Sequence, residues 1–165
     1  MHKKSIELLN KAIADELWAV HQYMYFHFHC DDQGYNLLAT LFKRTAIEEM
    51  MHVEKCAERI LFLKGEVEMK AAQEVKKIHK VKEMLEMAAK MEEESAKDYN
   101  IWANECSANA DSMTKQVFES LVSDEERHFD QYDSELENLA KFGDNYLALQ
   151  SIETSKVRQS GPSAG

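Results

Sequence analysis

The sequence contains very few residues that break a helix or shape a turn. Its 165 residues include five glycines and a single proline, Pro162, which lies close to the C-terminal end. Because glycine and proline are the strongest local breaks in a helical pattern, their scarcity leaves room for only a few short connections. Glu, Lys, Ala, Leu and Met, all good helix formers, are abundant instead. The composition therefore predicts an all-α protein of one domain.

Three further absences narrow the possible classes of protein. Positive charge is not in excess, because 20 Lys and Arg stand against 30 Asp and Glu, and the net charge of −10 disfavours nucleic acid as a partner. No apolar run approaches the length of a membrane span, and even ILFL at residues 60–63 is flanked by charged residues. Cys30, Cys56 and Cys106 form no Cys-x-x-Cys pair, and the N-terminus shows no secretory signal. These features predict a cytoplasmic protein that does not bind membranes.

Apolar residues recur at steps of three and four residues over four long segments, which predicts four helices. The predicted helices span residues 3–31, 35–64, 79–108 and 112–142. Tight turns join the first helix to the second and the third to the fourth, so each pair should be antiparallel. The polar segment GEVEMKAAQEVKK at residues 65–77 is long enough to cross the length of the bundle.

Capping residues and the C-terminal composition mark the ends of these elements. Helix C-caps are expected at Gly65 and Gly143, and N-caps are expected at Asp31, Asp32, Asn109 and Asp111. A short fifth helix is predicted within DNYLALQSIETSK at residues 144–156. The predicted domain covers residues 1–152, and residues 153–165 are predicted to form a flexible tail.

A Glu-x-x-His motif occurs twice, at Glu49–His52 and at Glu125–His128. A chain with this many glutamates and seven histidines would contain about one such motif by chance, so the motif alone decides little. The two copies lie 76 residues apart, however, and Glu16 and Glu92 repeat at the same offset. Other pairs with this offset are Leu9 and Leu85, Tyr23 and Tyr99, Cys30 and Cys106, Phe42 and Phe118, and Leu63 and Leu139. Each half of the chain is therefore predicted to be a similar helical hairpin.

The repeated Glu and His residues lie on the helix faces that should be apolar. On the second helix, this face carries Leu38, Phe42, Thr45, Glu49, His52, Cys56, Ile60 and Leu63. Four carboxylates buried together would repel one another, whereas two divalent cations would balance their charge. Carboxylate oxygens with one imidazole per metal suit iron, and open coordination positions would admit O₂ or peroxide. The predicted ligands, which are also the predicted catalytic residues, are Glu16, Glu49, His52, Glu92, Glu125 and His128.

At these residues the chain resembles bacterioferritin, and the resemblance covers nearly its whole length. The stretches that carry it are LLNKAIADELWAVHQY, IEEMMHVEKCAERILFLKG, EEESAKDYN, LVSDEERH and NYLALQ. The resemblance implies a ferritin-like antiparallel four-helix bundle in which Glu49 and Glu125 bridge two irons. It implies that Glu16 and His52 complete the first iron site and that Glu92 and His128 complete the second.

The resemblance also implies a function and partners. The di-iron centre would oxidise Fe(II) with O₂ or H₂O₂, and a ferric mineral would be stored inside a hollow shell of 24 subunits built from two-fold dimers. A small ferredoxin is implied as a redox partner, and haem between subunits would aid iron release. The family's inner-surface iron site is in doubt, because Arg44 and Glu48 stand where that site has a His and an Asp.

Met50 is the residue that the resemblance implies as the haem ligand, one from each of two subunits. It lies about 100° around the helix from Glu49, so it belongs to an outer face of the helix. Residues predicted to share that apolar face are Ala46, Ile47, Val53 and Ala57. Such a face should contact another subunit. Met51 points in another direction and is a weaker candidate.

Two other functions and one purely structural interpretation compete with iron storage. A rubrerythrin-like di-iron peroxidase without a storage role shares the bundle and the paired motifs, but its rubredoxin part needs Cys-x-x-Cys pairs that this chain lacks. A DNA-coating miniferritin is disfavoured because the chain has no basic tail and because that family's iron sites lie between subunits. A metal-free bundle would leave four carboxylates in the core without compensating charge.

Several other polar residues have competing interpretations. His21, His27 and His29 do not share one helical face, which favours ordinary solvated or core histidines over a second metal site. Tyr23 and Tyr99 lie two turns from Glu16 and Glu92, so they are candidates for hydrogen bonds to the site carboxylates, for electron donors or for core residues. Cys56 is interpreted as a small core residue.

Overall fold

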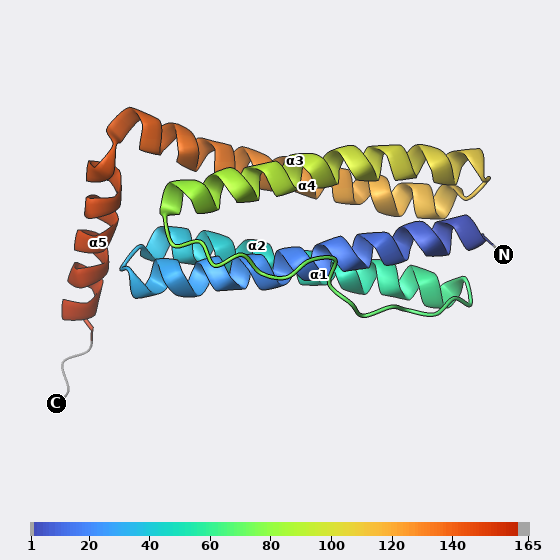
Figure 1. The fold of residues 1–165 in the computed structure, drawn as a ribbon, viewed down its shortest axis with the longest axis horizontal. Coiled ribbons are helices and arrows are strands. Elements are labelled where there is room, and N and C mark those ends of the chain that lie inside the picture. The colour runs from blue at the N-terminus through green and yellow to red at the C-terminus, as the bar shows by residue number, and fades with distance from the viewer. Residues whose placement is uncertain (1, 162–165) are drawn as a thin grey trace.

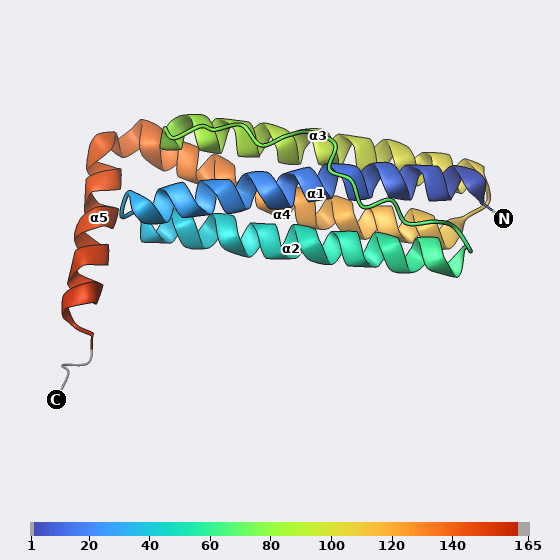
Figure 2. The ribbon, with the colours of Figure 1, turned by 60° about the horizontal axis from the view of Figure 1, so that its bottom comes forward.

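The computed structural model describes residues 2–161 and consists of five helices without a strand in that range. The helices are α1 (Lys3–Asp32), α2 (Asn36–Phe62), α3 (Val81–Ala108), α4 (Ser112–Phe142) and α5 (Asp144–Gln159). The first four form a long bundle, and α5 turns away from one end of it (Figures 1 and 2). The predicted fold is therefore confirmed. None of the described helices is long and apolar enough to cross a membrane.

The C-terminal helix is longer than its sequence pattern indicated. Helix α5 continues to Gln159, three residues beyond the predicted segment 144–156. The boundary between a domain at 1–152 and a tail at 153–165 stays a prediction, and residues 162–165 of that tail lie outside the described residues.

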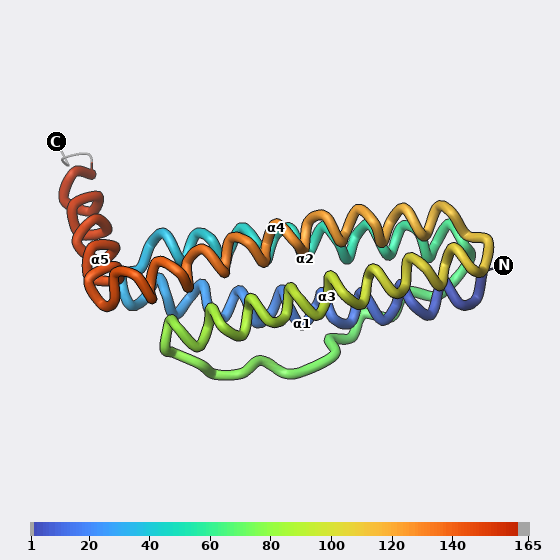
Figure 3. The backbone as a smooth tube through the Cα atoms, turned by 90° about the horizontal axis from the view of Figure 1, so that it is seen from above, coloured from blue at the N-terminus to red at the C-terminus, as the bar shows by residue number. Residues whose placement is uncertain are grey.

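The segment between α2 and α3 runs along the outside of the bundle, beside α1 and α3 (Figure 3). It brings the chain back to the end at which α2 began, so α2 and α3 run in the same direction (Figure 1). Two side-chain amides on α1 fasten this segment. Gln22 bonds to both the amide and the carbonyl of Lys76 at 2.8 and 2.9 Å, and Asn10 bonds to the carbonyl of Glu66 and the amide of Glu68 at 2.9 Å. The connection is therefore ordered although it is not helical.

The N-cap of α4 is the capping prediction that the structure confirms. Asp111 accepts a hydrogen bond from the Thr114 amide at 3.1 Å, which satisfies a free donor in the first turn of the helix. The same carboxylate pairs with Arg59 of α2 at 2.8 Å, and this contact joins the two hairpins at one end of the bundle. Three other predicted N-caps were wrong. Asp31 and Asp32 belong to the last turn of α1, and Asn109 is the C-cap of α3.

Of the two predicted C-cap glycines, Gly143 takes that position in α4, with φ of 61°. Gly65 follows α2 for a different reason. The left-handed residue there is Lys64, with φ of 63°, whereas a Cβ on Gly65 would lie only 2.8 Å from the Ile6 side chain. The glycine is thus needed for the close approach of α1 rather than for a left-handed backbone.

The apolar core is divided into two clusters along the bundle axis. The cluster nearer α5 contains Tyr23, Phe26, Phe42, Leu85 and Tyr132, and the other cluster contains Leu9, Ile13, Ile60, Tyr99 and Phe118. On each of the four helices, a buried glutamate separates the residues of one cluster from those of the other. The sequence therefore interrupts its core at one level in all four helices, and that level contains the polar site.

Candidate metal centre

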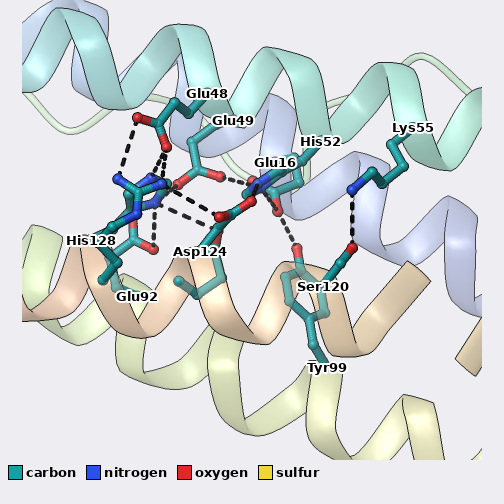
Figure 4. Close-up of polar contacts among 12 residues, drawn as sticks. Glu16, Glu48, Glu49, His52, Lys55, Glu92, Tyr99, Ser120, Asp124 and His128 are labelled. Carbon is teal, nitrogen blue, oxygen red and sulfur yellow. Dashed lines mark hydrogen bonds and ion pairs between the residues drawn. The ribbon is translucent and has the colours of Figure 1, made fainter. Parts of the chain in front are cut away.

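The four helices bring the six predicted ligands together between the two core clusters. Figure 4 labels all of them except Glu125. Helices α1 and α3 each contribute one glutamate, while α2 and α4 each contribute a glutamate and a histidine three residues later. Residues three apart lie on the same side of a helix, so each Glu-x-x-His pair points into the bundle. All six side chains are buried, and none has more than 4% of its surface exposed: Glu16, Glu49, His52, Glu92, Glu125 and His128.

The ligand atoms fall into two groups, and within each group they lie within 4.8 Å of one another. One group contains Glu16 and His52, the other contains Glu92 and His128, and Glu49 and Glu125 belong to both. Two shared carboxylates between two groups are the geometry that bridging ligands require. The structure thus brings together every residue of the predicted site, while the assignment of these residues as ligands stays a prediction.

Both histidines direct their Nδ1 atoms toward the carboxylates. His52 Nδ1 lies 3.0 Å from Glu49, 3.1 Å from Glu125 and 3.2 Å from Glu16. His128 Nδ1 lies 3.0 Å from Glu49 and 3.5 Å from Glu92. Each imidazole could therefore offer Nδ1 to a cation held by the carboxylates.

The opposite nitrogen of each histidine contacts a carboxylate from the other hairpin. His52 Nε2 lies 2.9 Å from Asp124 of α4, and His128 Nε2 lies 2.7 Å from Glu48 of α2 (Figure 4). When a neutral imidazole donates its Nε2–H to a carboxylate, the lone pair on Nδ1 is available to bind a metal. Sequence reasoning missed these roles, although Glu48 and Asp124 are themselves 76 residues apart and so belong to the internal repeat.

Two buried tyrosines donate hydrogen bonds to site carboxylates, as one of the competing predictions held. Tyr23 bonds to Glu92, and Tyr99 bonds to Glu16, each at 2.6 Å. Each bond joins α1 to α3, so the tyrosine of one hairpin holds the glutamate of the other. The tyrosines therefore hold Glu16 and Glu92, the two glutamates that are not shared between the two groups of ligand atoms.

Burial and mutual repulsion make the protonation of this cluster unusual. Burial and the neighbouring Glu16 carboxylate raise the pKa of Glu49 and of Glu125 well above the ordinary value. Burial alone would lower the pKa of His128, but the neighbouring carboxylates of Glu125 and Glu92 raise it to about 10. Burial would raise the pKa of Glu92, yet the adjacent His128 holds it below the ordinary value. Protons therefore balance the negative charge when no metal does so.

Two buried carboxylate oxygens in the cluster, Glu92 Oε2 and Glu125 Oε1, accept no hydrogen bond of good geometry. Their nearest nitrogens are His128 Nδ1 at 3.5 Å and His52 Nδ1 at 3.1 Å. A coordinated cation would satisfy both oxygens better than these ion pairs do. The donor set of oxygens and imidazole nitrogens thus fits two divalent metal ions.

Metal binding at this cluster should release protons. Because the pKa of His128 is raised to about 10, this residue keeps a proton at pH 7, and the raised pKa values of Glu49 and Glu125 favour their protonated forms as well. A divalent cation has to displace such protons. The apparent affinity for Co²⁺ should therefore rise as pH rises, by about tenfold per pH unit for each proton released. Titration with Co²⁺ at pH 6 and pH 7, together with a pH indicator in weakly buffered solution, measures both quantities. An affinity independent of pH, without proton release, would contradict the protonation described here.

A polar cavity of about 210 Å³ reaches the cluster from the side of α1 and α3. Glu92 and Glu125 line its inner part, and the carboxylates of Asp15, Glu94 and Asp98 line it as well. Negative charge along such an opening attracts cations. The cluster is therefore connected to the surface by a path suited to metal ions.

Met50 lies outside the metal cluster on an exposed apolar surface. Its side chain is 52% exposed, and the neighbouring Ile47 and Met51 are 45% and 57% exposed. The predicted face was too wide, because Ala46 and Val53 are buried within the two core clusters. Ile47 and Met50, three residues apart, thus share an exposed apolar face of α2, whereas Met51 lines the cavity beside Glu48 and Asp124.

Comparison of the sequence with known proteins shows which family the chain resembles. The ferritin-like domain family matches residues 6–142. The chain is 37% identical to the bacterioferritin of Desulfovibrio desulfuricans over 145 residues, which cover 88% of this chain and 81% of the relative. It is 36% identical to the bacterioferritin of Brucella melitensis over 141 residues, which cover 86% of this chain and 88% of the relative.

A solved structure agrees with these sequence relatives. The X-ray structure of the Desulfovibrio desulfuricans bacterioferritin, which describes a diiron site in different catalytic states, superposes with a TM-score of 0.88. The match has 36% sequence identity and covers 90% of this chain and 86% of that chain.

Proposed function

Because the chain belongs to the ferritin-like domain family and, within it, to the bacterioferritins, we propose that it oxidises Fe(II) at a di-iron centre and stores the ferric product. The observation that carries this proposal is the convergence of four buried glutamates and two histidines in two groups that share Glu49 and Glu125. The product would be held as a mineral inside a hollow shell of subunits.

In this proposal each group of ligand atoms holds one iron. Glu16 and His52 would hold the first iron, Glu92 and His128 would hold the second, and Glu49 and Glu125, which belong to both groups of ligand atoms, would serve both. Bound iron would supply the one-electron chemistry that passes electrons from Fe(II) to O₂ or H₂O₂. The protein's part is electrostatic, because four carboxylates favour the more highly charged ferric product over Fe(II).

The residues around the ligands limit how the centre can rearrange. Tyr23 and Tyr99 hold Glu92 and Glu16 through their hydroxyl groups, while Glu48 and Asp124 hold the histidines from the outer side. The acidic cavity beside Asp15 would admit Fe(II) from the surface. The centre is therefore preorganised for two cations and accessible to them.

The proposal includes haem and a large assembly. Met50 would hold the haem iron through its thioether, together with the same residue of a second subunit at a two-fold dimer interface. Its exposure together with Ile47 supports an interface at this surface. Twelve such dimers would form the shell of 24 subunits, and a small ferredoxin would reduce the stored iron through the haem. The three buried free cysteines, Cys30, Cys56 and Cys106, suit a reducing cytoplasm.

Aerobic loading with Fe(II) tests storage directly. The purified protein should elute from a sizing column as a large assembly and, after loading, retain ferric iron far in excess of the two ions per subunit that the two ligand groups can hold. A small species that keeps only those two ions and consumes H₂O₂ would favour the rubrerythrin-like peroxidase instead. A protein that oxidises no Fe(II) would overturn the proposal.

A further inference from the structure

Arg127 connects the two carboxylates that lie behind the histidines of the metal cluster. It precedes His128 on α4, and its guanidinium group contacts Glu48 through both terminal nitrogens, with Nη1 lying 3.4 Å from Oε1. Its Nη2 also lies 3.4 Å from Asp124 Oδ1. A guanidinium fork can hold two oxygens of one carboxylate and still reach a second carboxylate. Arg127 thus bridges α2 and α4 outside the cluster.

Each of these two carboxylates also contacts the Nε2 atom of one histidine of the cluster. Glu48 Oε2 lies 2.7 Å from His128 Nε2, and Asp124 Oδ2 lies 2.9 Å from His52 Nε2. One cationic side chain therefore reaches both histidines, in each case through one carboxylate. The contact to Glu48 is made by two nitrogens and the contact to Asp124 by one, so the His128 side is held more firmly.

The carboxylates need such a partner because water can reach them. The side chains of Glu48 and Asp124 are 31% and 38% exposed, in contrast to the buried ligands. A cavity of about 280 Å³ opens on this side of the bundle, lined by Glu48, Met51, His52, Lys55 and Asp124. The ammonium group of Lys55 donates its hydrogen bond to Ser120, at 3.0 Å, rather than to either carboxylate. Without the guanidinium group, both carboxylates could turn toward solvent, and each histidine would lose the acceptor at its Nε2.

The repeat does not supply a second cation for this purpose. The residue 76 positions before Arg127 is Met51, so one guanidinium group from α4 serves both halves of the centre. The arrangement is therefore a departure from the two-fold pattern that the ligands, the tyrosines and the outer carboxylates follow.

We propose that Arg127 is a positioning residue that clamps Glu48 and Asp124 together and thereby slows the release of metal from the di-iron centre. This inference rests on the proposed function, because it concerns how firmly that centre keeps its ions.

The rate at which a chelator removes Co²⁺ from the loaded assembly tests the clamp. Removal from Arg127→Ala should be about three- to tenfold faster than from wild type, because losing an outer-sphere contact typically weakens metal binding by about 10- to 100-fold and Arg127 acts one contact further out. Arg127→Lys, which keeps the charge without the fork, should lie between the two. Arg44→Ala is the matched control, since Arg44 is exposed one turn before Glu48 and should not change the rate.

A coupled variant separates positioning from a general charge effect. In the background of Glu48→Gln with Asp124→Asn, adding Arg127→Ala should cause no further acceleration, because the groups through which it acts are already neutral. Equal rates for wild type and Arg127→Ala, or an unchanged acceleration in that background, would overturn the clamp alone. Failure of wild type to take up Co²⁺ would instead overturn the proposed function, and the clamp with it.

Discussion

Replacing Glu49 with Gln should lower the initial rate of Fe(II) oxidation by at least about 100-fold, since changes to residues outside the ligand shell already cost 10- to 100-fold. Glu49 belongs to both groups of ligand atoms, so its amide would weaken two sites with one substitution. The rate is measured from the absorbance of the ferric product after mixing Fe(II) with oxygenated buffer.

The matched control for this experiment is Glu54→Gln, which neutralises an exposed glutamate on the same helix. It should oxidise Fe(II) at the wild-type rate. If the Glu49→Gln protein oxidised Fe(II) at an initial rate within about twofold of the wild-type rate, the shared carboxylate would not be required for oxidation.

Replacing Met50 with Leu should abolish haem binding and leave the di-iron centre intact. Leucine keeps the size and apolar character of the side chain but lacks the thioether that would bind haem iron. The reduced wild-type assembly should show the absorption spectrum of a haem with two thioether ligands, and the Met50→Leu assembly should show none.

The exposed neighbour provides the control for the haem experiment. Met51→Leu changes the same kind of side chain one position along and should keep the haem. Both variants should bind non-haem metal as wild type does, since neither residue belongs to a ligand group. If the Met50→Leu assembly retained haem, a residue other than Met50 would bind the haem iron.

The sequence was sufficient to predict the fold and the residues of the cluster because both depend on periodicity. A helix buries the residues at steps of three and four, so a glutamate on that line has to enter the core. All eight residues of the face predicted for the second helix, from Leu38 to the C-cap Leu63, are buried in the structure. The offset of 76 residues then relates α2 to α4 and α1 to α3 without further information.

The contacts that Glu48, Asp124 and Arg127 make outside the ligand cluster could not be predicted in the same way. They depend on side-chain length and on the distance between helices. Glu48 lies beside the buried line of α2, where a partly exposed glutamate usually faces solvent. Only the approach of α4 shows that Glu48 reaches His128 and that Arg127 reaches Glu48. The width of the apolar face at Met50 was wrong for a related reason, since neighbouring helices cover Ala46 and Val53.

A titration of the metal-free assembly with Co²⁺ in the absence of oxygen, followed by absorption spectroscopy, determines whether the six residues form a di-metal centre. If the six residues form one centre within each subunit, binding should saturate at two ions per subunit, one for each group of ligand atoms. Glu49→Gln should weaken both binding steps together, because both groups share that residue. Saturation at two ions that is unaffected by Glu49→Gln, or no specific binding at all, would contradict a di-metal centre at this position.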